Sequence, residues 1–117
     1  MGVFIGSVVL NAADNARASA FWAGALGYSA RENPDFVTPP EWSPPSKARA
    51  DHGAAHLHVD RGDRMHLDLW LDEGSDFDAE VDRLVALGAR RVEWDYPEDA
   101  DFVVLADTEG NLFCVVS

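Results

Sequence analysis

The chain repeats one plan of strand, helix and further strands, and this repeat restricts its possible folds more than any other feature. Two segments with helical patterning both end in the tripeptide ALG, and their glycines, Gly27 and Gly88, lie 61 positions apart. A shift by that distance lays Val8–Leu10 over Leu69–Leu71, and both tripeptides precede a predicted helix. Self-similarity at a fixed spacing indicates two copies of one supersecondary unit.

The residues around each predicted helix are those that begin and end helices. Asp14 is expected to cap the first helix, and Ser75 with Asp78 to form a capping box at the second. A glycine directly after each helix suits the left-handed backbone found at that position. The apolar residues of the second helix recur at the spacing of one helical face, namely Phe77, Val81, Leu84 and Val85.

Strand candidates follow each helix, so each half reads as β-α-β-β-β. They span 28–32, 35–38 and 54–59 in the first half, and 90–94, 102–106 and 112–116 in the second. The proline-rich segment PPEWSPPSKARAD is predicted to be a loop, and the last hairpin to turn at DTEGN. The pattern predicts an α+β fold in which a curled, mostly antiparallel sheet carries the helices on its outer face.

Length and composition indicate one ordinary globular domain. The 117 residues suffice for one core, with module one expected at about 1–60 and module two at about 64–117. No apolar run reaches the roughly 18 residues of a membrane span, and the N-terminus has no basic leader. A single cysteine, Cys114, excludes an internal disulfide and fits a reducing cytosol. We therefore expect a cytoplasmic protein.

The charge balance bears on the partners. There are 21 acidic residues against nine basic ones, for a net charge of −12. Binding to DNA or RNA needs a basic surface, so no nucleic-acid partner is expected. The negative field favours a neutral or cationic ligand. Solubility alone would explain the same composition equally well.

The stretch MHLDLWL alternates strictly between two faces of a predicted strand. The leucines lie on one face, which is expected to pack against a helix, and His66, Asp68 and Trp70 lie on the other. By the same alternation His56 shares a face with His58. Alternate residues of a strand are separated by roughly 6.6 Å, so His66 and Asp68, or His56 and His58, can converge on one ligand. In the remaining strands, Ser7 is expected on a face with Ile5 and Val9, and Cys114 on a face with Leu112 and Val116.

Together these features resemble the vicinal oxygen chelate superfamily, and within it the single-domain glyoxalase-like and bleomycin-resistance-like proteins. Besides the repeated plan, the resemblance is carried by FW and LG in the first helix, RMHLDL at 64–69 and EGNLF at 109–113, and it covers nearly the whole chain. It implies two βαβββ modules whose sheet curls around a ligand bowl, commonly in homodimers. Many members hold one divalent metal, with a ligand from the first and last strand of each module.

Two of the four metal positions that the resemblance implies are altered here. Ser7 stands where the first-strand histidine falls, and Cys114 stands where the last-strand glutamate falls. A site of histidine, aspartate and thiolate would suit zinc, and nickel, manganese and iron are the other ions expected in such a protein. The candidate metal ligands are His66, Asp68 and one of His56 or His58.

These polar residues also have ordinary interpretations. His66 and Asp68 can form a hydrogen-bonded pair without any ligand. A cysteine outside a disulfide, such as Cys114, is usually a small buried apolar residue. His58 lies near an expected strand end, where it would be solvated. His56 lies deeper in the strand and is the stronger candidate for the bowl.

The tryptophans extend the set of candidate ligand contacts. Trp42, Trp70 and Trp94 are expected to reach the bowl or its rim, where flat side chains bind aromatic or cationic molecules. Alternatively, Trp70 and Trp94 fill space between sheet and helix or at a dimer interface. The candidate ligand-binding residues are His56, His66, Asp68, Trp70, Trp94, Cys114 and Trp42.

Three functions remain open from the sequence. The first, which we favour, is a small-molecule binding protein that holds its ligand in the bowl without the usual metal site. The second is a divalent-metal-dependent lyase, isomerase or dioxygenase, in which the ion polarises vicinal oxygens of the substrate. The third is a non-catalytic interaction domain. The altered positions Ser7 and Cys114, the acidity and the tryptophans favour the first.

Overall fold

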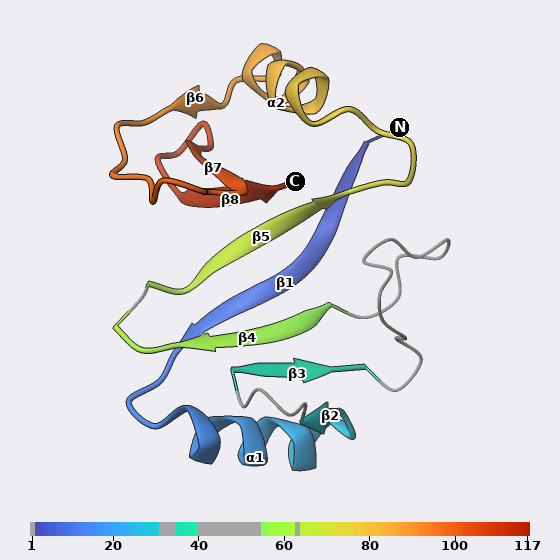
Figure 1. Cartoon of the computed structure of the whole chain (residues 1–117), viewed down its shortest axis with the longest axis vertical. Helices are drawn as coiled ribbons and strands as arrows, with labels where there is room; N and C mark the ends of the chain where they lie inside the picture. The colour runs from blue at the N-terminus through green and yellow to red at the C-terminus, as the bar shows by residue number, and fades with distance from the viewer. Residues whose placement is uncertain (1, 31–34, 40–54, 63) are drawn as a thin grey trace.

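A computed structural model describes residues 2–30, 35–39, 55–62 and 64–117, and the statements below concern these residues. They form two successive β-α-β-β-β units, as predicted (Figure 1). The elements are β1 (Val3–Asn11), α1 (Asn15–Leu26), β2 (Ser29–Ala30), β3 (Phe36–Thr38), β4 (His56–Asp60), β5 (His66–Leu71), α2 (Phe77–Ala86), β6 (Arg90–Arg91), β7 (Phe102–Ala106) and β8 (Leu112–Val116).

The eight strands of the described residues form one open sheet in the order β2-β3-β4-β1-β5-β8-β7-β6. Within each unit the first strand runs parallel to the last, β1 beside β4 and β5 beside β8. The remaining neighbours are antiparallel, including β1 and β5, which join the two units at the centre. This confirms the predicted α+β fold with a curled, mostly antiparallel sheet.

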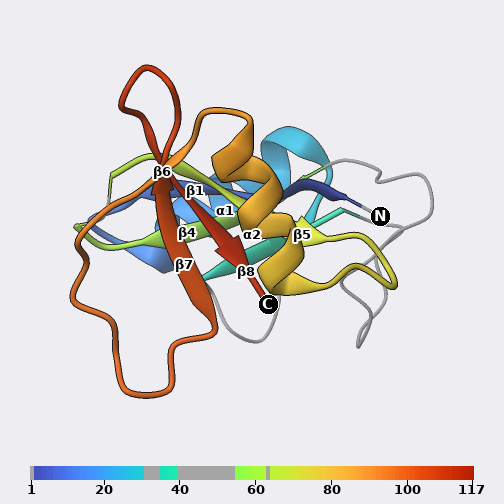
Figure 2. The ribbon, with the colours of Figure 1, turned by 90° about the horizontal axis from the view of Figure 1, so that it is seen from above.

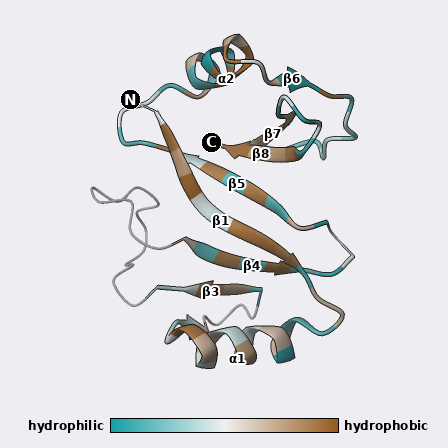
Figure 3. Cartoon of the chain, turned by 180° about the vertical axis from the view of Figure 1, so that it is seen from behind, coloured by the Kyte–Doolittle hydropathy of each residue, from teal (hydrophilic) through white to brown (hydrophobic). Residues whose placement is uncertain are grey.

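The two helices cover opposite ends of the sheet (Figure 1). α1 contacts β2, β3 and β4. α2 covers the other end, beside β7 and β8 (Figure 2). There Val81 packs against Leu105 of β7 and Val115 of β8, all of them fully buried. The leucine face of β5 meets this core at Leu71, but Leu67 is 38% exposed because β5 lies between the two covered ends. Figure 3 shows hydrophobic residues following the strands and hydrophilic ones in the connecting turns.

α1 begins and ends where the sequence predicts. The Asp14 carboxylate accepts a hydrogen bond of 3.0 Å from the Arg17 N–H. Gly27 ends the helix with φ of 71°, a left-handed conformation that favours glycine.

The predicted capping box at α2 is wrong. Asp76 caps this helix, and its carboxylate accepts a hydrogen bond of 2.9 Å from the Ala79 N–H. The hydroxyl of Ser75 instead accepts a hydrogen bond of 2.9 Å from the Gly2 N–H, at the start of the chain. Serine and aspartate are about equally good N-caps, so local preference could not decide between adjacent residues. Val85, predicted on the inner face of α2, is exposed.

β1 contains a bulge at Gly6. Ile5 pairs with Leu69 of β5, but Ser7 pairs with Asp68, so Gly6 is an extra residue in β1. A bulge interrupts the alternation of side chains along a strand.

The bulge corrects one predicted face. Phe4, and not Ile5, shares a face with Ser7. Phe4 pairs with Trp70 and Ser7 pairs with Asp68, and these two partners lie two residues apart on β5, on one face of that strand. Directly paired residues in an antiparallel ladder point to the same side of the sheet.

One predicted strand is shorter than expected: β6 has two residues, and 92–94 is not in a strand. Residues 31–32 of the strand predicted at 28–32 lie outside the described residues. The proline-rich segment and its Trp42 lie outside the described residues. None of the helices that the structure describes is long and apolar enough to cross a membrane.

Candidate functional site

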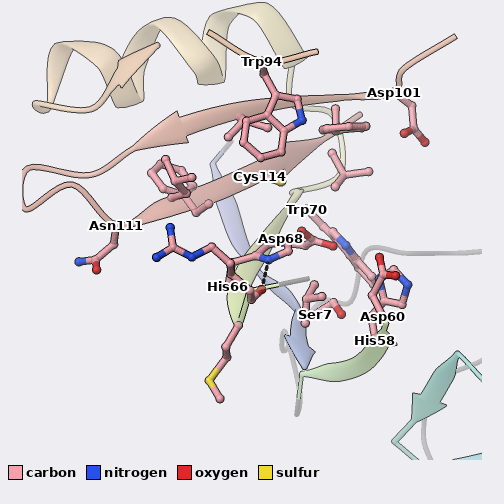
Figure 4. A pocket seen from close by; sticks show the side chains of 18 of the residues that line it. Ser7, His58, Asp60, His66, Asp68, Trp70, Trp94, Asp101, Asn111 and Cys114 are labelled. Carbon is pink, nitrogen blue, oxygen red and sulfur yellow. Dashed lines mark hydrogen bonds and ion pairs between the residues drawn. The ribbon is translucent and has the colours of Figure 1, made fainter. Parts of the chain in front are cut away.

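A cavity of about 810 Å³ lies on the face of the sheet opposite α2 (Figure 4). Alternation along β7 and β8 shows which face of the sheet the cavity occupies. Val104 and Cys114 line the cavity, while Leu105 and Val115 point the other way and pack under α2. Both units contribute to its wall. The volume falls within the roughly 300–1,000 Å³ range of small-molecule sites.

One row of residues crosses the floor of the sheet on four neighbouring strands. Ser7 pairs with His56 on one side and with Asp68 on the other, and Asp68 pairs with Cys114. These are the positions at which the resemblance implies metal ligands. The fold therefore brings them together, although the sequence separates the first and last by 107 positions.

His66 lies two residues before Asp68 on β5 and forms a polar pair with it. The His66 Nε2 atom lies 3.4 Å from Asp68 Oδ1, and both side chains are largely buried. His66 Nδ1 lies 2.7 Å from the main-chain oxygen of Arg64. A carbonyl oxygen can only accept, so Nδ1 carries a proton and Nε2 faces the carboxylate.

Cys114 completes a three-residue cluster with this pair. One ligand atom each from His66, Asp68 and Cys114 lie within 4.8 Å of one another. The register explains the convergence: His66 and Asp68 alternate onto one face of β5, and Cys114 is the neighbour of Asp68 on β8. Ser7 lies on the other side of Asp68, 3% exposed, and its hydroxyl oxygen has no hydrogen-bond partner among the described residues.

Trp70 forms the aromatic part of the floor. The centroid of its ring lies 6.1 Å from the ring centroid of Phe4, in an edge-on arrangement, and 4.9 Å from the ring centroid of His56. His56 is 5% exposed and packs against the indole, whereas His58 reaches the cavity wall and stacks on Phe36 at 4.5 Å. The structure therefore brings His58, rather than the deeper His56, to the cavity.

The wall also contains residues that the sequence did not single out. Phe36 and Phe102 add aromatic surface, and Asp60 and Asp101 add carboxylates. Phe102 was within reach of sequence reasoning, because it alternates with Val104 along β7. Asp60 carries the same signal, because it alternates with His58 along β4, whereas Asp101 lies outside the strands and carries none. Trp94, which was predicted, lies on the wall and is 48% exposed.

The residues at the four implied metal positions do not fit the superfamily's usual ligand set. A serine hydroxyl is a poor ligand, and His56 packs against Trp70. Imidazole, carboxylate and thiolate do converge, but through His66, which is not one of the four positions.

Comparisons with known proteins bear on the family and on the fold. The family described as glyoxalase-like domain matches residues 7–116. Curated proteins gave no match. Among solved structures, methylmalonyl-CoA epimerase from Mycobacterium tuberculosis is 20% identical with a TM-score of 0.56, over 98% of this chain and 86% of that one. A glyoxalase/bleomycin resistance protein/dioxygenase family enzyme from Burkholderia phytofirmans PsJN is 19% identical over 95% of both chains, with a TM-score of 0.38.

The structural likeness to the epimerase supports the fold alone, whereas the family match covers nearly the whole sequence. Both agree with the resemblance to the vicinal oxygen chelate superfamily. The chain belongs to the glyoxalase-like domain family.

Proposed function

We propose that the protein binds a small organic molecule with a flat aromatic part and a positive charge in this cavity, without the superfamily's usual metal site. The observation that carries the proposal is the composition of the wall, which combines aromatic faces with an excess of carboxylates. Small-molecule sites are commonly apolar pockets with a few polar groups that fix orientation.

The aromatic residues support the flat part of the ligand. Trp70 on β5 and Trp94 between β6 and β7 both line the cavity from the second unit. Phe102 lies on β7, the strand between β8 and β6. Indole faces attract cations most strongly among aromatic side chains, by about 0.5–2 kcal/mol. A planar cation would use both properties.

The charged residues of the cavity support a positive charge on the ligand. Among the described residues that line the cavity, Asp60, Asp68 and Asp101 are acidic and Arg64 is basic. The whole chain carries a net charge of −12. A cleft of one sign raises the local concentration of the opposite ion.

Ligand-dependent stabilisation tests the proposal. Three probes that share a benzyl group are compared by thermal unfolding: benzyltrimethylammonium as the cation, benzyl alcohol as the neutral molecule and phenylacetate as the anion. We expect the cation to raise the unfolding temperature most, since a ligand at 100 times its Kd stabilises by about 2.7 kcal/mol. Equal effects of cation and anion, or none from any probe, would contradict the proposal.

A matched pair of variants localises the binding. Trp94→Ala is expected to weaken binding of the cation about two- to thirtyfold, the equivalent of one cation–π contact. Phe21→Ala removes another exposed aromatic side chain, on α1 at the far end of the sheet, and is expected to leave binding unchanged. Equal affinities of the two variants would place the ligand elsewhere.

A second candidate function is a divalent-metal-dependent lyase, isomerase or dioxygenase. The cluster of His66, Asp68 and Cys114 within 4.8 Å favours it. A bound ion would polarise vicinal oxygens of a substrate as a Lewis acid. Elemental analysis of protein purified without a histidine tag or chelator is the first test of this candidate, and metal-dependent turnover of a vicinal-oxygen substrate would separate it from the first candidate.

Members of the superfamily commonly form dimers, and we propose a homodimer. Ile5 and Leu67 support it: both are exposed, on the side of β1 and β5 opposite the cavity. Light scattering of wild-type protein and of Leu67→Glu would test it, with monomeric wild-type protein as the contrary result. Cys114 is in no disulfide, which suits the proposed cytoplasmic location.

A further inference from the structure

We infer that His66, Asp68 and Cys114 form a three-ligand zinc site whose donors differ from the superfamily's usual set. The inference stands on this cluster and does not depend on the organic ligand proposed above. It rests on the spacing of the donor atoms, the orientation of His66, the buried hydroxyl of Ser7 and the chemistry of the thiolate.

The donor atoms already have nearly the spacing of a zinc site. Zinc bonds of about 2.0–2.1 Å to nitrogen and oxygen place two tetrahedral ligands about 3.4 Å apart. His66 Nε2 and Asp68 Oδ1 are 3.4 Å apart. A thiolate bonded at about 2.3 Å would lie about 3.6 Å from each of them. The three ligand atoms lie within 4.8 Å of one another, so small side-chain rotations close the site.

The orientation of His66 is that of a metal ligand. Its Nδ1–H donates to the main-chain oxygen of Arg64 at 2.7 Å. This arrangement fixes the tautomer and leaves Nε2 with a lone pair, as in most metal-binding histidines. On a neutral ring that lone pair faces the Asp68 carboxylate, which is unfavourable unless a cation lies between them. An imidazolium paired with Asp68 is the competing explanation, and it predicts no metal binding.

Ser7 supplies an independent indication of a ligand. Its side chain is 3% exposed and lines the cavity, next to Asp68 across the β1–β5 pair. The hydroxyl oxygen has no hydrogen-bond partner within the part of the chain that the structure describes. Buried hydroxyls are normally satisfied. Water or an anion bound in the open fourth position of a zinc ion would supply a partner.

The thiolate of Cys114 selects the metal. Soft thiolate and imidazole ligands favour zinc, whereas magnesium, calcium and manganese prefer sites made of oxygen. Three protein ligands and one open position are also the composition of catalytic rather than structural zinc sites. The replacement of a carboxylate by Cys114 thus predicts a change of metal preference.

Cobalt substitution tests the inference without any assay of activity. The full-length protein is stripped of metal and titrated with Co²⁺. We expect one equivalent to give a thiolate-to-cobalt charge-transfer band, with Zn²⁺ but not Mg²⁺ displacing the cobalt. Cys114→Ser should lose the band, and both Cys114→Ser and His66→Gln should weaken zinc binding by more than the roughly 10–100-fold typical of an outer-shell change.

His58→Gln is the matched control, because it removes another histidine of the cavity that lies outside the cluster. It should keep the cobalt spectrum and the zinc affinity. Circular dichroism of the metal-free variants establishes that each is folded, and Cys114→Ala replaces Cys114→Ser if the latter is not. Absence of the charge-transfer band in the wild type, retention of zinc affinity in His66→Gln, or its loss in His58→Gln would overturn the inference.

Discussion

The indole of Trp70 lies directly against the backbone of Gly6. A Cβ atom on residue 6 would be 2.0 Å from Cδ2 of the indole, closer than any real side chain can approach. The same ring contacts Phe4 and His56. The aromatic floor of the cavity therefore depends on a residue with no side chain, at the bulge of β1.

Gly6→Ala should displace Trp70 and destabilise the protein by about 1–3 kcal/mol, the usual cost of overpacking. Urea unfolding measures the change. Gly24→Ala is the control, since nothing lies within 4 Å of a Cβ at that helical position. Alanine there should stabilise α1 by up to about 1 kcal/mol. Equal effects of the two substitutions would contradict the packing described here.

The repeat in the sequence was sufficient to predict the order of elements and the curled sheet. It was visible because both units use the same helix ending and the same strand periodicity. Alternation also identified the shared face of His66 and Asp68. It could not show that Cys114 joins them, because that follows from the parallel pairing of β5 with β8, a contact between residues distant in sequence.

The remaining differences have local physical causes. The bulge at Gly6 shifts the alternation of β1, and no pattern of polar and apolar residues marks such an insertion. His56 was expected at the cavity because of its depth in the strand, but Trp70 packs against it. Side-chain packing across strands decides which residues reach a cavity, and periodicity alone contains no information on it.

Leu105→Ala should be among the most destabilising substitutions in the molecule. Leu105 is fully buried where β7 packs under α2, so its truncation leaves a cavity and should cost about 2–5 kcal/mol. Leu87→Ala, at a side chain that is 68% exposed, should change stability by less than about 0.5 kcal/mol. Chemical denaturation of both variants checks this prediction. A small effect at Leu105 would mean that α2 does not pack on the sheet as described.

The cap of α2 gives a similarly direct test. Asp76→Ala removes the acceptor for the Ala79 N–H and should cost about 0.5–2 kcal/mol. Asp76→Asn keeps an acceptor of equal capping strength and should be nearly neutral. Thermal unfolding of the two variants measures the difference. A loss of stability in the asparagine variant as large as in the alanine variant would show that the charge, rather than the hydrogen bond, matters at this position.

Asp107 should make the last hairpin sensitive to acid. Its carboxylate accepts hydrogen bonds from the Asn111 side chain at 3.0 Å and from the N–H groups of Asn111 and Glu109 at 2.9 and 2.8 Å. These bonds, the Asn111 side chain first, lower the pKa of Asp107 below its ordinary value. Ionised Asp107 therefore stabilises the folded state above the unfolded pKa of about 3.9, and this contribution is lost as pH falls through the folded pKa.

Asp107→Ala should consequently lower the unfolding temperature at pH 7, and the difference from the wild type should shrink as the pH falls below about 3.9. Asn111→Ala tests the assigned cause. Because it removes the largest contribution to the shift, the Asp107 carboxyl carbon should titrate at higher pH in that variant, as followed by NMR. A difference in unfolding temperature that does not depend on pH would mean that the hairpin is stabilised by the shape of Asp107 and not by its charge.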